Sequence, residues 1–173
     1  MTDASLAPDQ AQQLMVEATD DSFNSISVDG HMSTNDTAFL LASGQVGDKP
    51  LDGDDLVSFR AALLDVCIDL AKQIADDGEG ATHLITVRIN GCRTNGEAKT
   101  IAHAVANSPL VKTAVAGNDP NWGRIVSAAG YAGVPFDPAG VSLRLNGRLL
   151  YEAGAPTSFD AADAADSIRK NRD

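Results

Sequence analysis

The chain has 173 residues, enough for one sizeable hydrophobic core, and we expect a single domain over residues 1–173. Hydrophobic residues make up 43% and charged residues 21%, the ordinary range of globular proteins, which argues against wholesale disorder. The formal net charge is −11, from 13 Lys and Arg against 24 Asp and Glu. Because that field repels phosphate backbones and anionic lipids, we expect neither nucleic acid nor a membrane as partner.

The chain has two cysteines, Cys67 and Cys92, too few for a disulfide scaffold and without a metal-binding spacing. Cys67 lies among aliphatic residues, which favours a small buried hydrophobe. No apolar run reaches membrane-spanning length, and the acidic N-terminal region has no signal-peptide pattern. These features predict a cytoplasmic protein.

Helical spacing of apolar residues predicts helices over residues 8–18, 54–75 and 159–170. The long middle helix begins at an acidic cluster and is expected to end at the glycines that follow it. Thr94 and Glu97 have capping-box spacing, and Ser108 precedes a proline, so two more helices should begin there. A further short helix is predicted over residues 122–129.

Alternating or continuous apolar residues predict strands over residues 25–29, 37–42 and 84–89. Two more strands, 141–145 and 148–151, flank Asn146-Gly147, the strongest short hairpin signal in the chain. Helices interspersed with strands indicate the α/β class in a loose sense, with antiparallel pairing at the hairpin. The order of the strands stays open.

Residues 76–82, DDGEGAT, are the first candidate site. Glycines on both sides of Glu79 allow its carboxylate to be aimed into a cleft, where it would hold the ammonium group of an amino acid. A solvated helix end with glycine caps explains the same residues, and the residues alone favour that simpler explanation.

Residues 117–124, GNDPNWGR, are the second candidate. Asp119 followed by Pro120 is typical of a helix N-cap, and the free amides of a helix start together with the Arg124 guanidinium suit an anion. The alternative, which the residues favour, is a capped turn whose Trp122 packs in the core and whose Arg124 pairs with a local acid.

Residues 29–37, DGHMSTNDT, are the third candidate. His31 with nearby aspartates suggests a metal or a catalytic triad. No ligand at a suitable spacing completes a metal site, and no GxSxG elbow supports a triad. We therefore expect no metal, and no phosphate-binding glycine motif is present.

Three long motifs resemble, in the same order, the β chain of the ornithine acetyltransferase (glutamate N-acetyltransferase) family. They are SFNSISVDGHMSTNDTAFLLASG, DDGEGATHLITVRINGC and VANSPLVKTAVAGNDPNWGRIVSAAGYAG. The resemblance runs from Thr2-Asp3-Ala4 to the end of the chain. It implies a layered α/β sandwich of sheets and helices, reminiscent of N-terminal-nucleophile hydrolases.

The resemblance also implies an activity in arginine biosynthesis. Members of this family are self-cleaving precursors whose freed β-chain threonine takes acetyl from N-acetylornithine and passes it to glutamate. An N-terminal threonine carries its own amine as a base, and the acetyl-threonine intermediate splits the transfer into two steps. No cofactor is implied, although some members accept acetyl-CoA as donor. The implied partner is the α subunit of the same precursor, in a homo-oligomer or heterotetramer.

Carried over by motif, Glu79 of GEGAT contacts the amino-acid portion of the substrate. The resemblance gives no role to four other polar residues of the candidate segments: Asn35, Asp36, Asp119 and Arg124. The family's nucleophile would precede Thr2 by several residues, and its substrate-binding tail would follow Asp173. We therefore expect a β chain truncated at both ends, with no catalytic residue of its own.

Two other functions stay open at this point. One is a non-catalytic remnant that binds an amino acid or a partner chain, and the other is an aminopeptidase with an N-terminal nucleophile. The GEGAT and DPNWGR segments favour the acetyltransferase over the peptidase.

Overall fold

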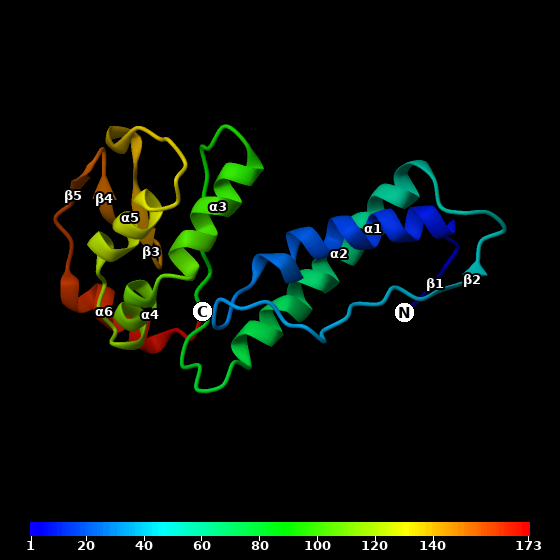
Figure 1. Ribbon diagram of the computed structural model, residues 1–173, viewed down its shortest axis with the longest axis horizontal. Helices are drawn as coiled ribbons and strands as arrows, with labels where there is room; N and C mark the ends of the chain where they lie inside the picture. The colour runs from blue at the N-terminus through cyan, green and yellow to red at the C-terminus, as the bar shows by residue number, and fades with distance from the viewer. The chain divides into compact units, whose positions relative to one another are not determined.

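The chain combines six α-helices with two small sheets in the computed structural model, which describes residues 1–173 (Figure 1). The class is therefore α/β, as predicted. The chain forms two compact units, Met1–Gly78 and Glu79–Asp173. The expectation of one domain over residues 1–173 stays a prediction. None of the helices is both long and apolar enough to cross a membrane.

The first unit is built on two helices packed side by side (Figure 1): α1 (Pro8–Asp21) and α2 (Gly53–Asp76). Both helices were predicted from their apolar spacing. Leu14 and Ala18 are the buried residues of α1, and Cys67 and Ala71 are those of α2. Small side chains at three of these four positions allow the two helices to approach closely.

Two short parallel strands join the start of the chain to the segment before α2: β1 (Thr2–Ala4) and β2 (Ala42–Val46). Thr2 lies opposite Ala42, and Ala4 lies opposite Val46. Every residue of β2 is exposed. The buried strand predicted over residues 37–42 is therefore wrong, because only its last residue enters a strand and that strand buries no face.

The second unit contains four helices: α3 (Asn95–Ala106), α4 (Pro109–Ala116), α5 (Trp122–Gly130) and α6 (Ala161–Lys170). The predicted helix starts are confirmed by their caps. Thr94 Oγ1 accepts a hydrogen bond from Glu97 N at 3.2 Å, and Ser108 Oγ accepts one from Val111 N at 3.4 Å. Each cap supplies an acceptor to an amide that has no partner within its helix.

A three-stranded antiparallel sheet completes the second unit, in the order β3 (Leu143–Leu145), β4 (Arg148–Glu152), β5 (Ala155–Pro156). The predicted hairpin is confirmed: Asn146 and Gly147 have φ of 48° and 79°, as a type I′ turn requires. Asn146 Nδ2 also donates to the Ser167 carbonyl at 3.2 Å, which ties the turn to α6.

The core of the second unit is formed by buried residues of its helices and of β4. Val105, Val111 and Ala128 form a buried cluster against which Val87 packs. Leu150 of β4 is fully buried. Its neighbour Tyr151 stacks on Trp122, with ring centroids 5.2 Å apart and planes 26° from parallel. Trp122 is half-buried and packs against the sheet, which agrees with the packing role that the residues favoured over an anion site.

The strands predicted over residues 25–29 and 84–89 are wrong, because neither segment forms a ladder of backbone hydrogen bonds. The first overlaps a short 3₁₀ turn, η1 (Phe23–Ser25), and Asp29 Oδ1 then accepts from His31 N at 2.8 Å. The second has one backbone bond, from Leu84 N to the Arg172 carbonyl at 2.6 Å. A second short turn, η2 (Pro138–Gly140), precedes β3.

Candidate functional site

Glu79 lies in the turn of residues 77–80 that follows α2. The helix ends with Asp77 N donating to the Gln73 carbonyl at 3.0 Å, and Gly80 then has φ of +73°, a left-handed conformation that favours glycine. The Glu79 side chain is exposed and makes no hydrogen bond or ion pair in the structure. A carboxylate held at a turn without a partner is available to an incoming cation, and its role in binding stays a prediction.

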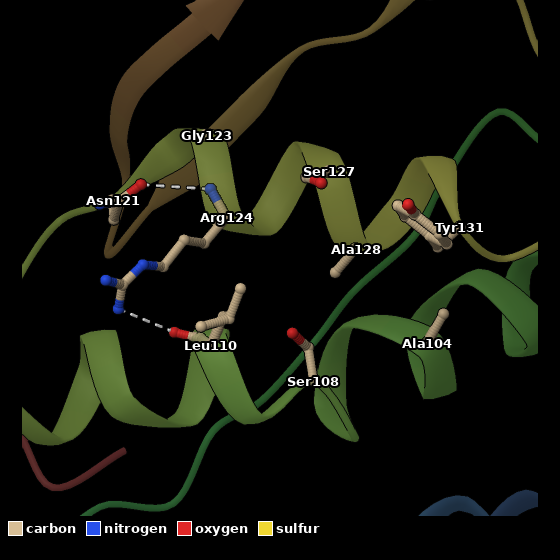
Figure 2. Close-up of a pocket in the computed structure, with 9 residues that line it drawn as sticks. All are labelled: Ala104, Ser108, Leu110, Asn121, Gly123, Arg124, Ser127, Ala128 and Tyr131. Carbon is tan, nitrogen blue, oxygen red and sulfur yellow. Dashed lines mark hydrogen bonds between the residues drawn. The ribbon is translucent and has the colours of Figure 1, made fainter.

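Helix α5 begins at Trp122, where the sequence predicted it, but with a different cap. Its N-cap is Asn121, whose Oδ1 accepts from Arg124 N at 3.2 Å (Figure 2). The prediction of Asp119 as the cap is wrong, because Asn121 supplies the same kind of acceptor two residues further on. The Asp119 carboxylate accepts from Asn121 Nδ2 at 3.0 Å and so orients the capping amide.

Arg124 extends from α5 to the facing helix α4 (Figure 2). Its Nη1 group donates to the Leu110 carbonyl at 3.1 Å and to Thr113 Oγ1 at 3.3 Å. No carboxylate pairs with it, so the expected pairing with a local acid is wrong. The two bonds fix the guanidinium between the two helices.

A groove of about 730 Å³ lies between α5 and the corner where α3 meets α4 (Figure 2). Arg124 is at one end, and Tyr131 is at the other. The hydroxyls of Ser108 and Ser127 line it from opposite walls, and Ala128 contributes part of its apolar surface. The groove thus combines one fixed cation with neutral polar and apolar groups.

Sequence reasoning missed the groove, although a signal for it was present. Arg124, Ser127 and Tyr131 stand at positions i, i+3 and i+7, so they share one face of α5. Ser108 was noticed only as a helix cap, a role that it has. The spacing along α5 predicts that these three polar side chains lie together, but it does not predict that α3 and α4 face them across a groove.

The segment around His31 has the character of an exposed loop. Asn35 N and Asp36 N both donate to Ser33 Oγ, at 3.2 and 3.1 Å. No group of three or more His, Cys, Asp or Glu side chains in the structure could hold a metal ion. Turn-forming hydrogen bonds account for the polar residues of this segment, and Asn35 and Asp36 receive no further role from it.

Both cysteines are free, and Cys67 is buried. Burial raises the pKa of the Cys67 thiol, while a hydrogen bond with Ser22 acts in the opposite direction. A raised pKa keeps the thiol protonated at neutral pH, which is the reverse of what a nucleophilic cysteine needs. Cys67 is therefore a packing residue.

Comparison with known proteins places the whole chain in one family. The ArgJ family model matches residues 1–173. The "Arginine biosynthesis bifunctional protein ArgJ" of Rhodopirellula baltica is 47% identical over 174 residues, covering 99% of this chain and 42% of the relative. The chloroplastic protein of that name from Citrullus lanatus is also 47% identical, over 98% of this chain and 38% of the relative.

A solved structure extends the comparison to three dimensions. The crystal structure of the argJ protein from Bacillus halodurans matches with a TM-score of 0.94 and 38% identity, over 98% of this chain and 80% of that one. The α/β fold implied by the three sequence motifs is therefore confirmed. The chain spans about two fifths of the length of the curated relatives, 42% of the one from Rhodopirellula baltica. On the family match, the sequence identity and the shared fold, this chain belongs to the ArgJ family.

Proposed function

We propose that the chain is the β-subunit portion of an ornithine/glutamate N-acetyltransferase, an acyltransferase of arginine biosynthesis. The observation that carries the proposal is the family match over every residue, 1–173. Curated relatives at 47% identity are named bifunctional arginine biosynthesis proteins. The proposal extends that activity to this chain as part of a complete α/β assembly.

In the proposed reaction, the hydroxyl oxygen of a threonine attacks the acetyl carbonyl of N-acetylornithine. The amide C–N bond breaks, and ornithine leaves with the proton. The amine of glutamate then attacks the acetyl ester, which releases N-acetylglutamate and restores the threonine. The reaction needs no cofactor, and acetyl-CoA is a further donor for some members of the family.

The threonine nucleophile of this proposal is not Thr2. In the register of the three motifs, Thr2-Asp3-Ala4 follows the nucleophile by several residues. A hydroxyl displaced by that much lies outside hydrogen-bond reach of the oxyanion donors. The 173-residue chain alone is therefore proposed to be inactive, and its partner to be the α subunit made by self-cleavage of the same cytoplasmic precursor, in a heterotetramer or larger oligomer.

Glu79 is the residue of this chain to which the proposal gives a substrate contact. Its exposed carboxylate, with no partner of its own, suits the ammonium group of N-acetylornithine by a charge-assisted hydrogen bond.

A chimera tests the proposed function. The 173 residues replace the aligned segment of the Rhodopirellula baltica relative, which is 47% identical over 174 residues. Acetyl transfer from N-acetylornithine to glutamate is then measured against the unaltered relative. We expect transfer by the chimera and none by the 173-residue chain. A folded, correctly cleaved chimera without transfer would favour the non-catalytic remnant, and hydrolysis of peptides would favour the aminopeptidase.

A further inference from the structure

Arg124 is a fixed cation without a counter-ion. Four other arginines form ion pairs with acids: Arg60, Arg93, Arg148 and Arg169. Arg124 has only neutral partners, the Leu110 carbonyl and the Thr113 hydroxyl. The chain has 24 acidic and 13 basic residues, yet Arg124, like the exposed Arg144 of the hairpin, is held by neutral groups alone.

The free edge of this guanidinium is the one that carboxylates prefer. A guanidinium has five N–H donors, and Arg124 uses only its Nη1 group for the two bonds to α4. The Nε–H and Nη2–H donors remain, and together they form a fork that matches the two oxygens of a carboxylate. Because Nη1 is already anchored, little side-chain freedom is lost when that fork is occupied.

The rest of the groove suits a small molecule with one charged end. No carboxylate side chain lines it, and its hydroxyls, from Ser108, Ser127 and Tyr131, are neutral. Leu110 provides apolar surface beside the guanidinium, and Ala128 provides more of it further along the groove toward Tyr131 (Figure 2). The volume, about 730 Å³, lies within the range of roughly 300–1,000 Å³ that is usual for small-molecule sites.

We propose that this groove binds a small organic acid, with its carboxylate on the Nε and Nη2 edge of Arg124 and its apolar body against Leu110 and Ala128. The proposed site consists only of this chain's own residues and does not depend on the proposed acetyltransferase activity. A carboxylate can be carried by a free acid or by a polypeptide side chain, and the open groove is accessible to both. The free acid is favoured because the open groove, of about 730 Å³, has the size of a small-molecule site and all of its lining residues come from one short stretch, 104–131.

The test is a titration of the ¹⁵N-labelled 173-residue chain, followed by the amide NMR signals of Gly123 and Ser127. The probe is glutarate, and the matched neutral probe is glutaramide, which has the same carbon skeleton without charge. We expect saturable shifts at both amides with glutarate, with a Kd on the order of 1 mM. Glutaramide should bind roughly tenfold to a hundredfold more weakly, because charge-assisted hydrogen bonds are lost.

Variants then identify the group that binds. Arg124→Gln should weaken glutarate binding by the same factor, roughly tenfold to a hundredfold. Arg124→Lys keeps the charge but not the fork, and should give an intermediate value. Arg144→Gln is the control: Arg144 is an exposed arginine that donates to the Gly147 carbonyl at 3.2 Å on β3, so its loss should leave binding unchanged.

Several results would overturn the inference. They are the absence of saturable shifts at Gly123 and Ser127, equal binding of glutaramide, and full binding by Arg124→Gln. Binding of a blocked Ala-Glu-Ala peptide without binding of glutarate would place the carboxylate on a polypeptide and would also overturn it. If Arg124→Gln failed to fold, the glutarate and glutaramide comparison on the unaltered chain would still decide.

Discussion

Replacement of Leu150 by alanine should destabilise the second unit strongly. Leu150 is 0% exposed, so truncation leaves a cavity in addition to losing the transfer free energy of the removed carbons. For a fully buried leucine the expected loss is about 3–4 kcal/mol of unfolding free energy. In urea this corresponds to a fall in the unfolding midpoint of roughly 1–3 M.

The chain offers both a reporter and a control for this measurement. Trp122 is the single tryptophan and stacks on Tyr151, the residue after Leu150, so its fluorescence reports unfolding of this unit. Leu110 is 60% exposed, and Leu110→Ala should change the unfolding free energy by no more than about 0.5 kcal/mol. A loss below about 1 kcal/mol for Leu150→Ala, or one equal to the Leu110→Ala value, would refute the packing argument.

Three further predictions concern a helix cap, an ion pair and the proposed substrate contact of Glu79. Asp160 Oδ1 accepts from two amides at the start of α6, at 2.9 and 3.0 Å, so Asp160→Ala should lower the unfolding free energy by about 1 kcal/mol in the same urea assay. A hydrogen bond from Arg148 lowers the pKa of Asp163, so this pair stabilises the fold above the unfolded pKa near 4 and ceases to do so as the pH falls through the folded value. Asp163→Asn should therefore lower the urea midpoint at about pH 7 but not at about pH 2. Glu79→Gln in the chimera should raise the KM for N-acetylornithine roughly tenfold to a hundredfold while self-cleavage and thermal stability stay unchanged, and an unaltered KM would return Glu79 to a solvated helix end.

The helices could be predicted because their signals are local. Thr94 and Ser108 cap the helices that follow them, as their spacing to the next residues indicated. The Asn146-Gly147 turn is equally local, since it needs only two residues that tolerate positive φ. A rule that acts over four or five residues can be read from a sequence without knowledge of the rest of the fold.

The strands predicted over residues 25–29, 37–42 and 84–89 failed because a strand depends on a neighbour that the local pattern does not specify. Burial alternates along residues 85–90, as a half-buried strand would require, and Val87 packs on the helical cluster. The alternation of apolar and polar residues therefore does correspond to alternating burial, but the buried side chains contact helices and not a neighbouring strand. Between the strands predicted over residues 25–29 and 37–42, side-chain acceptors such as Asp29 Oδ1 and Ser33 Oγ bind nearby amides and form turns.

The second candidate segment shows where local rules stop being sufficient for a site. Local chemistry predicted a capped helix start, and one formed, although the cap is Asn121 and not Asp119. The partner of Arg124 could not be predicted in this way, because Thr113 and Leu110 lie on another helix and are brought there by packing of α4 against α5. Those contacts occupy one edge of the guanidinium and leave the edge that binds carboxylates. The cation is thus evident from local residues, whereas the packing of two helices determines which of its donors are available to a ligand.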